Sequence, residues 1–196
     1  MSFKPIEEFE NKVAKFYNAP YAVAVDCCTH GIELCLRYTQ ARSITVPTRT
    51  YISIPFLAKK LNLKWSWKEE DWVDYYRLGN TDIIDAAVLW KENSYIPSTY
   101  TCLSFQFQKH LSLGRGGMIL TDNKTSFDDL KKMSYDGRVP DTPWREQNIK
   151  TMGYHYYMTP ETASLGLKKL PEAIGAEPRQ WRVSDWPDLR EMEIFK

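Results

Sequence analysis

The chain has 196 residues, 43% of them hydrophobic and 14% aromatic, which is enough for one domain with a packed core. Its 26 Lys and Arg residues against 25 Asp and Glu leave a net charge of +1, so charge gives no reason to expect nucleic acid or a membrane surface as a partner. The first ten residues lack the apolar core of a secretion signal, and no later stretch approaches the roughly 18 apolar residues that span a bilayer.

The cysteines agree with a cytoplasmic location. Cys27, Cys28, Cys35 and Cys102 do not show the CxxC spacing of zinc or redox sites, and they are expected to be buried thiols in a reducing compartment. Adjacent cysteines rarely converge on one ion, so Cys27, Cys28 and His30 do not predict a metal site.

The first third of the chain alternates helices and strands. Ile6, Phe9, Val13 and Phe16 recur at helical spacing, which predicts a helix ending near Asn18. Apolar runs then predict strands at 21–25, 43–47 and 63–67, with a helix after each of the first two.

The remainder continues the pattern less regularly. Strands are expected up to Asp85, at 101–107 and at 117–122, followed by a helix at 126–135. Thr159 as N-cap and Pro160 at the first position predict a last helix, ending at Leu170. The segment between Trp65 and Asn80 shows no clear period and receives no assignment.

Strands that alternate with helices predict an α/β fold, an α/β/α sandwich with a mostly parallel sheet. Ligands of such sheets bind beyond the carboxyl ends of the strands, where helix N-termini offer free amides. The residues at these ends are Cys28 and Thr29 at the first turn, Tyr51 at the second, Asp85 after the third clear strand, and Ser104 with Lys109 around the fourth.

Five segments resemble, in order, the DegT/DnrJ/StrS family of pyridoxal-phosphate sugar aminotransferases. They are VAVDCCTHGIEL, ITVPTRTYIS, TDIIDAA, LSFQFQKHLSLGRGGMILTD and GYHYYMTPETASLGLKKL. The resemblance implies the large domain of PLP-transferase fold type I over residues 1–170, with one unit of the sheet trimmed and the C-terminal small domain largely missing. It also implies a homodimer with a shared active site. A shortened subunit leaves more surface to cover, so Trp181 or Trp186 of the aromatic tail at 171–196 is expected to pack on the partner subunit.

The resemblance assigns roles to these residues. Lys109 would form an imine with the aldehyde of pyridoxal 5′-phosphate, and Asp85 would face its pyridine nitrogen. Cys28, Thr29 and Ser104 would hold the phosphate, and the Tyr51 ring would stack on the pyridine. His155 stands where the family has an Asn that reaches the phosphate of the neighbouring subunit's cofactor.

Other positions depart from the family pattern. Tyr157 replaces an Arg, Val88 a Gln or His, and Gln106 a His. Because Tyr cannot supply a guanidinium to an anionic substrate group, these departures concern substrate recognition more than cofactor binding.

The predicted function is transfer of an amino group from an amino acid, expected to be glutamate, to a nucleotide-linked keto sugar. One alternative is a catalytically reduced homologue that serves as a binding or assembly module. Another is a PLP-dependent sugar dehydratase, which Lys109 disfavours because those relatives typically carry histidine there.

Overall fold

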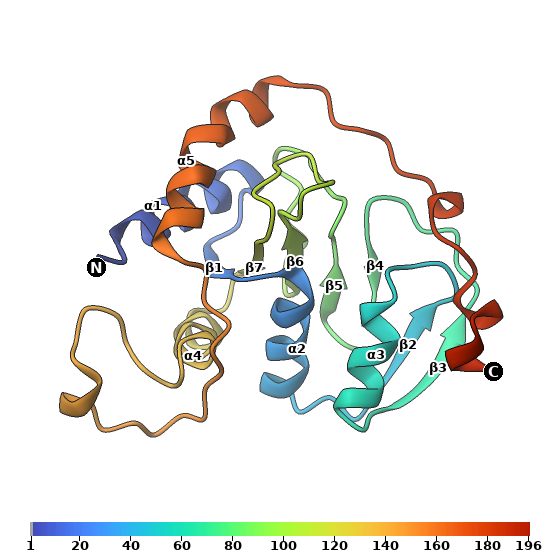
Figure 1. The fold of residues 1–196 in the computed structure, drawn as a ribbon, viewed down its shortest axis with the longest axis horizontal. Coiled ribbons are helices and arrows are strands. Elements are labelled where there is room, and N and C mark those ends of the chain that lie inside the picture. Colours follow the sequence, from blue (N-terminus) through green and yellow to red (C-terminus); the bar gives the residue numbers. More distant parts are fainter. Residues whose placement is uncertain (1) are drawn as a thin grey trace.

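The computed structural model describes residues 2–196 and contains two sheets. The main sheet has five strands in the order β1-β7-β6-β5-β4, and β2 and β3 form a separate parallel pair. The strands are β1 (Tyr21–Val25), β2 (Ser43–Pro47), β3 (Lys64–Lys68), β4 (Tyr76–Arg77), β5 (Ile83–Asp85), β6 (Tyr100–Ser104) and β7 (Gly117–Thr121). The α-helices are α1 (Lys4–Tyr17), α2 (Cys28–Tyr38), α3 (Ser53–Lys60), α4 (Lys124–Ser134) and α5 (Pro160–Gly175) (Figure 1). A single 3-10 turn, η1 (Trp144–Glu146), lies in the loop between α4 and α5.

Helices cover both faces of the main sheet, which confirms the predicted three-layer sandwich. Along β1, Ala22 and Ala24 join the core beneath α1 and α5, whereas Val23 and Val25 join the core with α2, α3 and α4. Successive side chains of a strand point to opposite faces, so one short apolar strand serves two cores.

The main sheet is mixed rather than mostly parallel. Only β5 and β6 pair in parallel within it, while β7 returns antiparallel between β1 and β6, and β4 pairs antiparallel with β5. The 105–116 connection contains no crossover helix, so β7 returns antiparallel beside β6, and the short 78–82 loop likewise allows only an antiparallel pair of β4 and β5. The strand β4 lies in the stretch without clear period, and its two residues were too few to give a pattern.

The last helix runs five residues past its predicted end and includes Pro171, so the expected domain boundary at 170 falls inside α5. Tertiary contacts outweigh the helix-breaking effect of Pro171. Ala173 is buried, and its carbonyl oxygen lies 3.2 Å from the Trp90 Nε1 donor and 2.7 Å from His110 Nε2.

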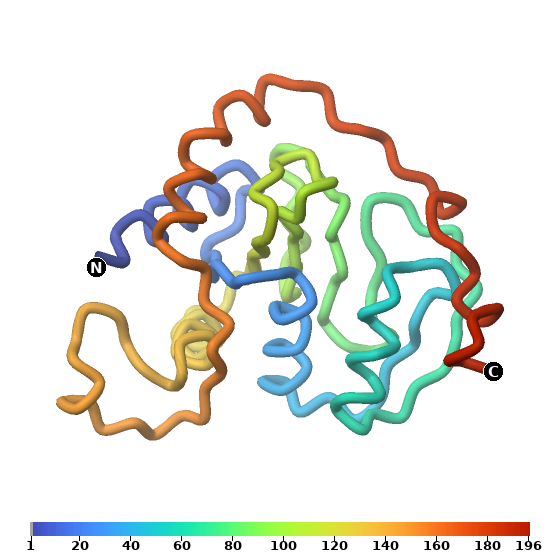
Figure 2. Tube along the Cα trace, in the orientation of Figure 1, coloured from blue at the N-terminus to red at the C-terminus, as the bar shows by residue number. Residues whose placement is uncertain are grey.

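After α5 the chain crosses the molecule and ends beside β3, as Figures 1 and 2 show. The crossing segment contains three 3-10 turns: η2 (Val183–Asp185), η3 (Leu189–Glu191) and η4 (Glu193–Phe195). Leu189 is buried and its amide donates to the Thr48 oxygen at 2.8 Å. The tail therefore packs on its own chain, and its contact with a partner subunit stays a prediction. Among the described helices, none combines the length and apolar character needed to cross a membrane.

Candidate active site

A cavity lies where the carboxyl ends of β5 and β6 meet the start of α2 and the tail. Six of the seven predicted site residues line it: Cys28, Thr29, Tyr51, Asp85, Ser104 and Lys109. They come from five separate segments of the chain, and the topology brings their side chains to one place.

Lys109 projects from the loop that joins β6 to β7. The loop is fixed by a backbone hydrogen bond from the Lys109 amide to the Gln106 oxygen (2.8 Å) and by the buried side chains of Leu111 and Leu113. Burial lowers the pKa of the Lys109 amine, and the charge of Asp85 opposes that shift. A lowered pKa increases the neutral fraction, which is the form that attacks a carbonyl.

Asp85 ends β5 and is buried. The Ala87 amide donates to its Oδ1 at 3.0 Å, and the Tyr76 hydroxyl donates to its Oδ2 at 2.5 Å. Burial raises the pKa of the Asp85 carboxyl, whereas the Tyr76 and Ala87 hydrogen bonds and the Lys109 charge lower it. Burial outweighs the rest, so the pKa of Asp85 lies above its ordinary value, and the two fixed donors and the amine limit that rise.

The start of α2 forms the polar floor of the cavity. The first amides of a helix have no partner within it, which favours an anion there. The Thr29 hydroxyl lies 2.8 Å from the Ser53 hydroxyl at the start of α3, while Ser104 ends β6 beside them. The Cys28 thiol instead donates to the Cys102 oxygen at 3.6 Å, so only the backbone of Cys28 is free to bind a ligand.

Gly117 explains how this floor fits against the sheet. A Cβ at this position would lie 2.5 Å from the Cys27 carbonyl carbon and 2.5 Å from the Cys28 nitrogen. Any side chain on Gly117 would therefore push the start of α2 away from β7.

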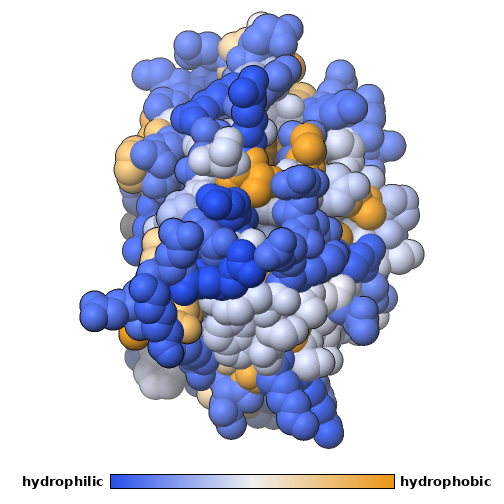
Figure 3. All heavy atoms as spheres, turned by 90° about the vertical axis from the view of Figure 1, so that its right-hand side faces the viewer, coloured by the Kyte–Doolittle hydropathy of each residue, from blue (hydrophilic) through white to orange (hydrophobic). Residues whose placement is uncertain are grey.

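Aromatic rings form the opposite wall. Tyr51 lines the cavity with 61% of its surface exposed, and the Trp181 ring lies 4.7 Å from the Lys109 Nζ atom. Trp186 lies 5.3 Å from Trp181 and 4.8 Å from Trp72, measured between ring centroids. Figure 3 views the side on which the tail ends, where residues of intermediate hydropathy lie among hydrophilic ones.

The structure does not bring His155 to the cavity of its own chain. Its ring is 70% exposed and its Nδ1 atom lies 2.9 Å from the Asp136 carboxylate. Tyr157 packs near Phe3 and Tyr135, also away from the cavity, whereas Val88 and Gln106 line it.

Sequence reasoning missed several residues that line the cavity. They are Thr50, Ser53, Trp72, Tyr76, Trp181 and Trp186. The density of aromatic residues between Trp65 and Tyr76 was the available signal for two of them, but without a period it could not be placed on an element. The two tail tryptophans were noted and were expected on a partner.

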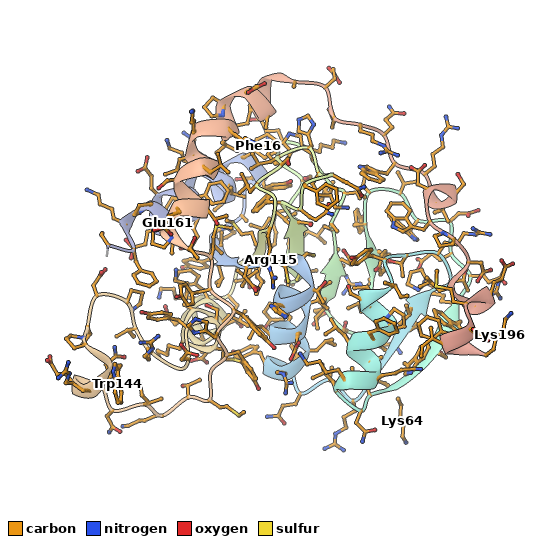
Figure 4. The ribbon with its side chains drawn as sticks, in the orientation of Figure 1. Phe16, Lys64, Arg115, Trp144, Glu161 and Lys196 are labelled. Carbon is orange, nitrogen blue, oxygen red and sulfur yellow. The ribbon has the colours of Figure 1, made fainter. Side chains whose placement is uncertain are left out.

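A second polar cluster adjoins the start of α2. Asp26, Cys27 and His30 carry possible metal-ligand atoms within 4.8 Å of one another. The Asp26 carboxylate is already paired with His30 Nδ1 at 2.7 Å and with Arg115 Nη2 at 2.7 Å. Arg115 lies near the centre of the molecule in Figure 4, above α2. Because a guanidinium occupies one carboxylate oxygen, this cluster is better described as an ion-pair network than as a metal centre.

Comparison with known proteins shows which proteins this chain resembles in sequence and in fold. It is 24% identical to GDP-perosamine synthase of Escherichia coli O157:H7 over 226 residues, covering 92% of this chain and 61% of the relative. Its fold matches the sugar aminotransferase CalS13 of Micromonospora echinospora with a TM-score of 0.74 and 13% identity, over 86% of this chain and 60% of the other. It also matches the PLP form of Spr1654 from Streptococcus pneumoniae with a TM-score of 0.69 and 18% identity, over 87% and 60%.

The chain thus spans about 60% of the length of these relatives. A family profile covers residues 1–65 and 97–179, and it leaves the segment 66–96 unmatched. That match extends over most of the chain, including the start of α2 and Lys109. The chain belongs to the DegT/DnrJ/EryC1/StrS aminotransferase family.

Proposed function

We propose that this protein is a pyridoxal-phosphate-dependent aminotransferase that moves an amino group from an amino acid, with glutamate as the expected donor, to a nucleotide-linked keto sugar. The observation that carries the proposal is the convergence of Lys109 and Asp85 in one cavity. The names of the relatives, a perosamine synthase and a sugar aminotransferase, support a sugar as the acceptor.

The residues present fit this cofactor. Lys109 offers an amine whose pKa burial lowers, and Asp85 offers a buried carboxylate that faces the same space. The α2 amides at Cys28 and Thr29, with the hydroxyls of Thr29 and Ser104, form a cradle for a phosphate. Tyr51 supplies the aromatic ring that would stack on a pyridine.

When bound, the cofactor supplies an aldehyde and an electron-withdrawing ring that stabilises charge on the substrate α carbon. Lys109 would attach it by an imine with loss of one water, and would later carry the proton between the α carbon and the cofactor as general base and acid. Asp85 would hold the ring nitrogen protonated. Across the whole reaction, the two substrates would exchange groups: the donor would lose its amino group and gain an oxygen from water to become a keto acid, and the sugar would lose its carbonyl oxygen as water and gain the amino group.

We also propose a homodimer in a reducing, cytoplasmic environment. The outward position of His155 agrees with a role toward a neighbouring subunit's cofactor, because it does not reach the cavity of its own chain. The four cysteines are free, including Cys35 and Cys102, whose sulfur atoms lie 3.9 Å apart. Light scattering should give the mass of two chains, and a monomer that holds cofactor and transfers amino groups would contradict the shared site.

A single-turnover experiment tests the main proposal. Protein loaded with pyridoxal phosphate is mixed with glutamate, and both the absorption of the cofactor and the 2-oxoglutarate released are followed. We expect up to one 2-oxoglutarate per bound cofactor, and then consumption of the amino group on adding a nucleotide-linked keto sugar. Lys109→Ala, assayed in parallel, should release none.

One observation favours the second candidate, a cofactor-binding homologue without turnover. The Trp181 ring centroid lies 4.7 Å from the Lys109 Nζ atom in the cavity, so the ring takes up space beside the amine that a substrate would need. Bound cofactor that releases no keto acid from any amino donor would favour this candidate over transamination.

A further inference from the structure

The Tyr76 hydroxyl is the closest contact of the Asp85 carboxylate. The two residues lie directly opposite each other in the β4–β5 pair, and the hydroxyl donates to Asp85 Oδ2 at 2.5 Å. Both side chains are buried, Tyr76 to 3% exposure and Asp85 to 5%. A short hydrogen bond to a charged oxygen away from water is among the stronger polar contacts in proteins.

A second hydroxyl fixes the direction of this bond. The Thr50 Oγ1 atom lies 2.6 Å from the Tyr76 hydroxyl oxygen. Because the single Tyr76 proton is given to Asp85, the Thr50 hydroxyl must be the donor to Tyr76. The donation polarises the Tyr76 hydroxyl and strengthens its own bond to the carboxylate. The hydrogen bonds thus run in one direction, from the Thr50 hydroxyl to the Tyr76 hydroxyl and from there to the Asp85 carboxylate, which accepts.

The hydrogen bonds to Asp85 lower the pKa of its carboxyl, whereas burial raises that pKa. The titratable groups that face Asp85 are Tyr76 on β4, Cys28 on α2, Cys102 on β6 and Lys109 in the β6–β7 loop. Burial raises the pKa values of both thiols and of the Tyr76 hydroxyl well above their usual range, so these three groups stay neutral near pH 7. Lys109 is the one cation of this set, and it loses its charge when it attaches a carbonyl. Hydrogen bonds from Tyr76 and Ala87 are then the support that the protein itself gives to a charged Asp85, beside the protonated ring nitrogen that it would face.

Tyr76 also lies in the segment 66–96, which the family profile does not match. The hairpin of β4 and β5 places it beside Asp85 through backbone pairing alone, and Trp72 packs on its ring at 5.1 Å. The Tyr76 side of the contact thus lies in a segment that the family profile leaves unmatched, while Asp85 stands in the family-like motif TDIIDAA.

Resting on the proposed function, we propose that Tyr76 is the positioning residue that orients Asp85 and keeps it ionised toward the pyridine nitrogen of the cofactor, with Thr50 behind it. Tyr76 acts through Asp85 and does not itself react.

The test compares Tyr76→Phe with Tyr75→Phe, its exposed neighbour, and with Thr50→Val. Two quantities are measured. The first is the titration midpoint of the Asp85 carboxyl in cofactor-free protein, followed by ¹³C NMR of labelled aspartates, with the Asp85→Asn variant used to assign the signal. The second is the dissociation constant of pyridoxal phosphate between pH 5 and 8. In Tyr76→Phe the Asp85 midpoint should rise by about one unit or more, and the cofactor should bind about tenfold more weakly at pH 7. Thr50→Val should shift both quantities in the same direction by less, and Tyr75→Phe should leave them unchanged.

The outcomes separate the two proposals. If Tyr76→Phe lowers only the melting temperature and titrates like Tyr75→Phe, Tyr76 is a packing residue and the inference is overturned. If the unchanged protein fails to bind pyridoxal phosphate, the proposed function fails, and the role toward the cofactor fails with it. The NMR midpoint still reports in that case whether Tyr76 keeps Asp85 ionised. If Tyr76→Phe does not fold, Thr50→Val decides by the same two measurements.

Discussion

The cavity has two walls of different origin. One wall comes from segments that the family profile matches, and it carries the start of α2, Ser53, Ser104 and Lys109. The other comes from the segment 66–96 and from the end of the tail, and it carries Trp72, Tyr76, Asp85, Trp181 and Trp186. The groups that would attach a cofactor and hold its phosphate thus lie on the wall shared with the family. The groups that would face the ring nitrogen and flank the amine lie in segments that the profile leaves unmatched, although Asp85 itself stands in the family-like motif TDIIDAA.

The largest expected effect is on the family wall. Lys109→Ala should abolish the visible absorption of bound pyridoxal phosphate and all amino transfer, because no other amine lines the cavity among the described residues. Lys168→Ala, on the exposed side of α5, is the matched control and should behave like the unchanged protein. Retained absorption in Lys109→Ala would place the attachment at another lysine.

The next effect tests the wall that is built from the segments the family profile leaves unmatched. Asp85→Asn keeps the shape of the side chain but removes its charge, so pyridoxal phosphate should bind on the order of 100-fold more weakly, as expected for loss of a charge-assisted hydrogen bond. Asp82→Asn removes an exposed carboxylate three residues earlier and should change little. Equal affinities in the two variants, measured by equilibrium dialysis, would remove Asp85 from the site.

A smaller effect concerns the attachment of the tail. Leu189 is 1% exposed, and Leu189→Ala should lower the free energy of unfolding by about 2–3 kcal/mol if the tail unfolds together with the domain. Leu165→Ala, at a position that is 37% exposed, should cost much less. A Leu189→Ala variant that melts like the unchanged protein but loses its tail to brief proteolysis would show that the tail opens independently.

The last effect is a dependence of stability on pH. Burial opposes a charge on His30, but the hydrogen bond that its Nδ1 donates to Asp26, the hydrogen bond with Cys27 and the charges of both residues together outweigh burial and raise the pKa of His30 to about 9. The folded chain then binds a proton that the unfolded chain releases near pH 6.5. Stability on the order of 2–3 kcal/mol should therefore be present below pH 6.5 and disappear as the pH rises to about 9.

The histidine variants isolate this contribution. His30→Gln should flatten the fall in unfolding free energy between pH 6.5 and 9 in cofactor-free protein, whereas His155→Gln, at a mostly exposed ring, should leave it in place. If the unfolding free energy falls equally steeply with pH in the unchanged protein, in His30→Gln and in His155→Gln, the Asp26–His30 pair adds nothing to stability.

The difference between the two walls also explains what sequence reasoning could predict. The strands at Tyr21–Val25 and Ser43–Pro47 and the start of α2 follow from apolar runs and turn residues, which are local signals. Lys109 and Asp85 were found because their motifs survive in this chain. Tyr76 and Trp181 were not found as site residues, because their positions depend on a two-residue strand and on tail contacts 70 or more residues distant in sequence, which leave no periodic pattern.

The parallel character of the sheet was overestimated for a related reason. Alternating helices and strands suggest parallel pairing, but the direction of β7 depends on whether the 105–116 loop contains a helix. The glycines at 114, 116 and 117 indicate a turn there, and they were interpreted as a motif rather than as a reversal of direction.

The most direct test is a crystal structure of the protein grown with pyridoxal phosphate. The account predicts electron density that continues from Lys109 Nζ into the cofactor, with the Asp85 carboxylate within hydrogen-bond distance of the ring nitrogen and the phosphate at the start of α2. Cofactor bound elsewhere, or bound in this cavity without a bond to Lys109 and without contact to Asp85, would contradict it.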